Sequence, residues 1–121
     1  MFDPAWASAW TTVFVPFEIL YAMGVGGNFI EFVGGMLAGS GMGRPYFEKA
    51  ESEGFSTDSC SYHRTIIGAA RQNMFPKPDL LIGASFPCDG GVKALKRVGE
   101  IYGLDVFLIH TPYENTPEAR K

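Results

Sequence analysis

The chain has 121 residues, of which 46% are hydrophobic and 19% charged, as in an ordinary globular domain. Its net charge of -3 gives no basic surface for nucleic acid, so no nucleic-acid partner is expected. No Lys or Arg precedes Arg44, so the basic segment of a secretory signal is absent. Glu18 and Glu31 interrupt the apolar stretch 13–43, which leaves no uncharged run of the ~18 residues that a membrane-spanning helix needs. These features predict a soluble, cytoplasmic protein without a membrane partner.

The first half of the chain is predicted to form short elements. A strand at 13–15 precedes a helix over 16–23, because proline opens that segment and glycine follows it. The stretch 24–43 carries eight glycines, so we interpret it as irregular with a short strand or helix inside. A polar helix over 45–53 follows, again with proline first and glycine directly after it.

The second half has a clearer pattern. The apolar segments 80–84 and 106–109 are predicted strands, and 91–102 between them has apolar residues at helical spacing. Strand, helix and strand in so short a span indicate a right-handed parallel crossover. We therefore expect one α/β domain over 1–121, a Rossmann-like or flavodoxin-like open parallel sheet with flanking helices.

Both cysteines stand where predicted helices begin. Cys60 lies in or just before the first turn of one helix, for which Ser, Thr and Asp at 56–58 are alternative N-caps, and Cys88 directly precedes another. Unpaired N–H groups and the helix dipole stabilise a thiolate there, and thiolate is the form that binds metal. Gly90 and Gly91 would not obstruct a bulky inorganic group. A cytoplasmic disulfide is not expected, whereas a packed thiol and a metal ligand both remain open.

Other motifs are incomplete. The glycine-rich segments match neither a dinucleotide-binding fingerprint nor a P-loop, and Ser85 in GASFP lacks the second glycine of a nucleophile elbow. His63 and His110 have no zinc-site spacing, so we interpret them as surface or hydrogen-bonded residues. Lys96 and Glu100 are expected to form an i,i+4 pair on a solvated helix face.

Three segments in order along the chain resemble the 2-hydroxyacyl-CoA dehydratase family, which includes the benzoyl-CoA reductase subunits. They are VPFEILYAMGV, CSYHRTIIG and PDLLIGASFPCDGG, and they fall within residues 13–91. The family pattern is a Pro-x-Glu-aliphatic run ending in Ala-x-Gly, then a cysteine with an arginine four residues later. A Pro-Asp-apolar strand that ends in Cys-Asp completes it.

The resemblance implies flavodoxin-like α/β domains and a [4Fe–4S] cluster that three cysteines hold, with one iron open to substrate. An ATP-hydrolysing iron–sulfur activator protein would donate one electron, and a ketyl radical formed from the acyl-CoA substrate would lose its hydroxyl group as water. The matching positions of this chain have three implied roles. They are Cys60 and Cys88 as cluster ligands, Arg64, Asp89, Gly90 and Gly91 as residues around the cluster, and Glu18 as an acid/base candidate.

Subunits of this family are roughly three times longer and take their third cysteine from a second domain. The chain therefore resembles an incomplete N-terminal domain, expected to be inactive alone and to need a second dehydratase subunit as partner. Three alternatives stay open. They are a benzoyl-CoA reductase-type subunit fragment, a non-catalytic α/β module that binds a partner, and a small flavodoxin-like protein that binds FMN. The last is disfavoured, because no loop has a clear Ser/Thr-rich phosphate-binding sequence.

Overall fold

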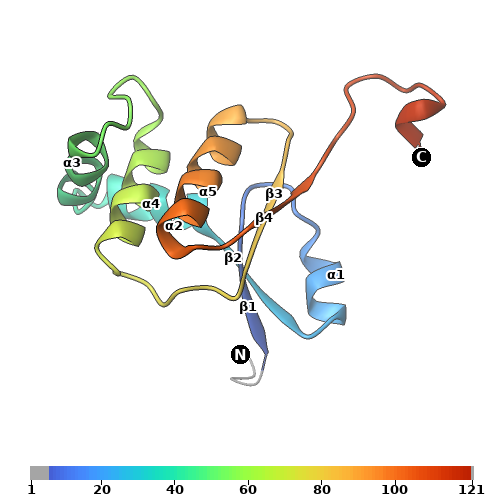
Figure 1. Cartoon of the computed structure of the whole chain (residues 1–121), viewed down its shortest axis with the longest axis horizontal. Coiled ribbons are helices and arrows are strands. Elements are labelled where there is room, and N and C mark those ends of the chain that lie inside the picture. The colour runs from blue at the N-terminus through green and yellow to red at the C-terminus, as the bar shows by residue number, and fades with distance from the viewer. Residues whose placement is uncertain (1–5, 121) are drawn as a thin grey trace.

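The computed structural model describes residues 6–120 and has a four-stranded sheet with helices on both faces (Figure 1). The strands are β1 (Ala7–Thr11), β2 (Val25–Phe29), β3 (Leu80–Ala84) and β4 (Val106–Ile109). The helices are α1 (Phe17–Ala22), α2 (Ile30–Gly39), α3 (Arg44–Ser52), α4 (Ser61–Arg71), α5 (Asp89–Tyr102) and the short 3₁₀ helix η1 (Glu118–Arg120). All strand pairs are parallel, in the order β2-β1-β3-β4. The predicted open parallel α/β sheet is confirmed.

The strand order places the centre of the sheet between β1 and β3. From β1 the chain moves outward to β2, and from β3 it moves outward to β4 in the opposite direction. Since parallel crossovers are right-handed, connections in opposite directions place their helices on opposite faces. Accordingly α1 covers one face, and α2, α4 and α5 cover the other, with α3 packed outside α4 (Figure 1). The predicted β3–α5–β4 crossover is confirmed with the expected residues.

The prediction of a first strand at 13–15 is wrong. The strand is β1, and residues 12–16 form the loop that leads from it to α1. The backbone N–H of Val13 illustrates the reason, because it donates a hydrogen bond of 2.8 Å to the Glu31 carboxylate and not to a neighbouring strand. The helix that follows ends as predicted, with Gly24 at a φ of +71°.

The glycine-rich stretch 24–43 is regular, contrary to the prediction, and consists mainly of β2 and α2. Its glycines allow close packing. A Cβ on Gly27 would lie 2.5 Å from the ring of Phe17, and one on Gly34 would lie 2.7 Å from the carbonyl oxygen of Tyr62. Glycine is needed at these positions because β2 packs tightly against α1 and α2 packs tightly against α4. Such contacts between elements cannot be predicted from sequence periodicity.

Two smaller expectations are also corrected. The N-cap of α4 is Cys60 and not one of residues 56–58, so the helix begins later than predicted. On α5, Glu100 pairs with Arg97 at 2.6 Å, and the expected pair with Lys96 is not the one that forms. The spacing of three residues brings Arg97 onto the same side of the helix as Glu100.

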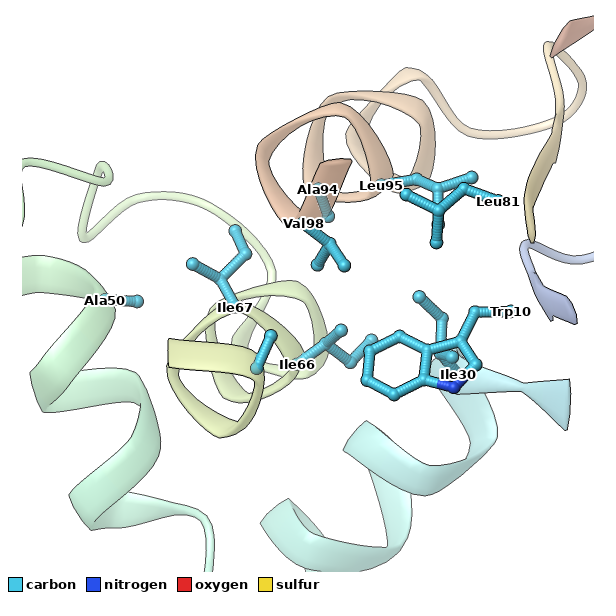
Figure 2. Close-up of a cluster of buried hydrophobic side chains, with 10 residues drawn as sticks. Trp10, Ile30, Ala50, Ile66, Ile67, Leu81, Ala94, Leu95 and Val98 are labelled. Carbon is cyan, nitrogen blue, oxygen red and sulfur yellow. The ribbon is translucent and has the colours of Figure 1, made fainter. Parts of the chain in front are cut away.

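The core has two parts because alternate strand residues face opposite sides of the sheet. Figure 2 shows the larger part, in which Trp10 of β1 and Leu81 of β3 meet side chains of α2, α4 and α5. The smaller part lies under α1. It includes Ala9 and Ile82, which are next to Trp10 and Leu81 in their strands and point to the other face of the sheet. Among the helices within residues 6–120, none is long and apolar enough to cross a bilayer.

Candidate functional site at the carboxyl edge of the sheet

The loops that follow β1 and β3 meet at the point where the strand order reverses. Thr12, directly after β1, accepts a hydrogen bond of 2.9 Å at its hydroxyl from the N–H of Ala84, the last residue of β3. Open α/β sheets bind their ligands outside the carboxyl ends of the strands at such a reversal. We call this region the carboxyl edge, formed by residues 12–16, residues 85–88 and the first turns of α4 and α5.

Both cysteines belong to this edge. Cys60 is the N-cap of α4 and Cys88 the N-cap of α5, and each is a free, exposed thiol. α5 starts directly after β3, and α4 ends before the loop that leads into β3, so both helices begin at the same end of the sheet. α4 and α5 also pack against each other. The alternative that the cysteines are packed core thiols is wrong, because neither is buried.

A buried acid–histidine pair lies beside the cysteines. Nε2 of His63, in the first turn of α4, is 2.9 Å from Oε1 of Glu31, in the first turn of α2. The two side chains are only 6% and 11% exposed. The other carboxylate oxygen of Glu31 accepts the hydrogen bond from the N–H of Val13. The pair therefore connects α2, α4 and the loop after β1.

The two glycines after Cys88 pack directly on this pair. A Cβ on Gly90 would lie 2.8 Å from Nδ1 of His63 and 3.4 Å from Sγ of Cys88. A Cβ on Gly91 would lie 2.5 Å from Oε1 of Glu31. The absence of side chains thus lets the first turn of α5 rest on Glu31 and His63. Sequence reasoning interpreted His63 only as surface or hydrogen-bonded and gave Glu31 no role, because their partnership depends on packing between helices distant in sequence.

The other residues implied by the resemblance lie around this edge in different ways. Asp89 is exposed in the first turn of α5, where a carboxylate is favoured by the helix dipole. Arg64 points toward α3, where it pairs with Glu51 and lies over the ring of Phe47 at 5.3 Å. Glu18 is exposed in the first turn of α1, on the opposite face of the sheet from α4 and α5.

Three exposed aromatic rings stand on the same edge. Phe14, from the loop after β1, stacks on Phe86 with ring centroids 6.0 Å apart, and Tyr113, beyond β4, meets Phe86 edge-on. Phe14 is 67% exposed and has a φ of +62°, a left-handed conformation that is rare for a bulky residue. Sequence reasoning did not find this cluster, because the three rings follow three different strands.

An apolar cavity of about 250 Å³ lies elsewhere, between the sheet, α2 and α4. Trp10, Leu37 and Phe75 are among its lining residues, and neither cysteine is. Its surroundings offer few polar groups that could do chemistry. The chemically distinctive groups of the described residues are therefore at the carboxyl edge.

Within residues 6–120, no three His, Cys, Asp or Glu side chains are grouped closely enough to hold a metal ion. The two thiols nevertheless fit an iron–sulfur cluster in donor chemistry, since cysteine side chains are the usual ligands of such clusters. They would supply two of its ligands, and the remaining ligand would have to come from outside this set.

Two comparisons relate the chain to known proteins. Residues 12–121 match the family model of the 2-hydroxyglutaryl-CoA dehydratase D-component. The chain belongs to this family. It is also similar to the (R)-phenyllactyl-CoA dehydratase alpha subunit of Clostridium sporogenes, with 30% identity over 114 residues. That match covers 88% of this chain but only 28% of the relative, so this member of the dehydratase family spans little more than a quarter of that subunit.

Proposed function

We propose that the chain is the cluster-binding part of a 2-hydroxyacyl-CoA dehydratase subunit, with Cys60 and Cys88 as two ligands of a [4Fe–4S] cluster. The observation that supports this is the pair of exposed thiols at the N-cap positions of neighbouring helices, at one edge of a parallel sheet. A further thiolate would come from a second α/β domain of the complete subunit.

The cluster, when bound, would supply an electron and an electrophilic iron for dehydration of the acyl-CoA by way of a ketyl radical. Asp89, Gly90 and Gly91 would form the turn beside it, and Arg64 would fix α4 through its contact with α3. Glu18 would act as acid or base on the substrate from α1. A second dehydratase subunit and an ATP-dependent iron–sulfur activator are the proposed protein partners.

Anaerobic reconstitution tests the ligand assignment. The chain is incubated with iron, sulfide and an excess of a small thiol, which takes the place of the missing ligand, and bound iron and sulfide are then measured after desalting. The wild-type chain should retain both, whereas Cys60→Ser and Cys88→Ser should each retain much less. The thermal unfolding midpoints should change little, because both side chains are exposed.

A Cys60→Ser/Cys88→Ser double variant that retains as much iron and sulfide as the wild type would refute the assignment. The alternative of a non-catalytic module that keeps the fold and binds a partner would then be favoured. His110→Gln serves as a control, because His110 is exposed directly after β4, beside the carboxyl edge, and shows whether loss of another metal-binding side chain nearby has the same effect.

A further inference from the structure

The apolar cavity between the sheet, α2 and α4 has no part in the function proposed above. Its volume is about 250 Å³, and neither cysteine is among its lining residues. A dry apolar cavity of about 150 Å³ is large enough to bind benzene, so this one has room for a ring with a short substituent, about ten non-hydrogen atoms in all. A helix or strand of another protein would not fit inside it.

The lining of the cavity is mainly apolar and carries no charge. Leu37 of α2 and Ile66 of α4 are among the side chains that form its walls. Among the described residues that line it, none is charged, and the polar side chains besides one tryptophan are Ser8 and Asn28. The Ser8 hydroxyl already bonds to Asp79, and Asn28 is exposed. A charged group would have no partner inside the cavity, so the part of a ligand that enters it must be neutral.

One polar group of the lining is without a partner. Trp10 of β1 is only 6% exposed, and its Nε1–H makes no hydrogen bond to any residue within 6–120. Figure 2 shows this nitrogen on the edge of the ring that is turned toward α2, which forms one wall of the cavity, and away from the side chains of α5. The nitrogen is not completely enclosed by protein, so a molecule in the cavity can reach it. The N–H of a buried tryptophan usually has a hydrogen-bond partner, and here a ligand can supply it.

We propose that this cavity binds a small neutral molecule, an aromatic ketone whose oxygen accepts a hydrogen bond from the N–H of Trp10. An aromatic ring suits the space, because Trp10 and Phe75 both line it and aromatic rings attract one another. An apolar side chain of a protein partner would fill the space but leave the N–H buried and unpaired, which is unfavourable. The proposal does not depend on the thiolate site, because neither cysteine lines the cavity.

Two substitutions test the two parts of this proposal, the cavity and the hydrogen bond. Val33 of α2 lines the cavity and is only partly buried, so Val33→Phe places a ring in the space that a ligand would occupy. Met36→Phe is the matched control, because Met36 is exposed on the same helix and is not among the lining residues. Trp10→Phe keeps an aromatic ring at its position but removes the N–H donor.

Acetophenone is the ketone probe, and α-methylstyrene is the matched hydrocarbon, with a CH₂ group in place of the oxygen. Both are titrated into the ¹⁵N-labelled chain, in which NMR follows the backbone amides and the indole N–H groups. Acetophenone should move the indole proton of Trp10 downfield in a saturable way, α-methylstyrene should not, and the signal of Trp6, outside the cavity lining, should stay in place. Val33→Phe should bind both probes about 10-fold more weakly than the wild type, and Met36→Phe should bind them equally well.

In Trp10→Phe, the ratio of acetophenone affinity to α-methylstyrene affinity should fall about 2–10-fold, because only the ketone loses a hydrogen bond. The ratio cancels the change in cavity size, which affects both probes. An unchanged ratio, or an equal shift of the Trp10 indole proton by both probes, would overturn the hydrogen bond and with it the proposal. The absence of saturable binding, or equal binding in Val33→Phe and the wild type, would overturn the cavity as the site.

Discussion

Asp79, directly before β3, ties the start of that strand to β1. Its carboxylate accepts hydrogen bonds from the backbone N–H of Ser8 at 2.7 Å and from the Ser8 hydroxyl at 3.1 Å. These hydrogen bonds hold the pKa of Asp79 below its ordinary value of 3.8, and the one from the backbone N–H of Ser8 contributes most. A carboxylate whose pKa is lower in the folded state stabilises the fold above the unfolded pKa, and this contribution is lost as the pH falls through the folded pKa.

Asp79→Asn imitates the protonated carboxyl group and should lower the free energy of unfolding at neutral pH. The difference from the wild type should shrink as the pH falls below about 4, because the wild-type carboxylate is then protonated as well. Urea unfolding at several pH values measures this. Asp105→Asn, at an exposed position before β4, is the control. A difference that stays constant down to pH 2 would contradict the explanation.

At the scale of elements, the contact between α3 and α4 depends on one glycine. A Cβ on Gly68 would clash with the carbonyl group of Tyr46, which is backbone and cannot move aside without shifting α3. Gly68→Ala should therefore destabilise the chain by about 1–3 kcal/mol in urea unfolding. Gly39→Ala is the matched control, since no atom lies within 4 Å of its Cβ position in the last turn of α2. It should be neutral or stabilise by up to ~1 kcal/mol, and a similar loss in both variants would contradict the packing argument.

The sequence predicted best the elements whose ends are marked locally. β3, β4 and the end of α5 were found because apolar segments are bounded by proline, glycine and charged residues, and Gly103 does adopt the expected left-handed conformation at +66°. β1 was missed because Ala7–Thr11 contains few residues typical of strands, and its place at the centre of the sheet comes from pairing with distant segments.

The same distinction holds for the candidate site. The position of each cysteine at a helix start can be predicted locally, because a helix start is a local feature. The pair of Glu31 and His63 cannot, since the two residues are 32 positions apart and meet only after α2 and α4 pack. The packing of Gly90 and Gly91 against that pair likewise cannot be predicted from the sequence, because it depends on where the pair lies in the fold.

At the scale of the whole molecule, the sheet is covered unequally. On the face that α1 covers, β4 is left open, and Phe107 of this edge strand is 68% exposed. An exposed apolar edge strand favours association between chains. We expect the isolated chain to associate with rising concentration, and Phe107→Lys to reduce this association without loss of stability.

Size-exclusion chromatography with light scattering measures the association over a range of concentrations. Phe32→Lys is the control, because Phe32 is similarly exposed, at 61%, but lies on α2 and not on the sheet. Equal effects of both variants would indicate general hydrophobic contact instead of strand-edge association. A wild-type chain that stays monomeric at every concentration would contradict the prediction.

The central position of β1 also has a consequence for the time course of synthesis. A hydrogen bond between β1 and β2 joins Thr11 and Asn28, which are 17 residues apart in the sequence. A hydrogen bond between β1 and the residue before β3 joins Ser8 and Asp79, which are 71 residues apart. At about 5–20 residues per second, a ribosome needs roughly 4–14 s to make the second interval. During those seconds one edge of β1 has no partner, and Trp10 lacks the later-made Leu81 and Leu95 that bury it. The nascent chain is therefore most vulnerable to misassembly at β1, the strand that later lies in the middle of its sheet.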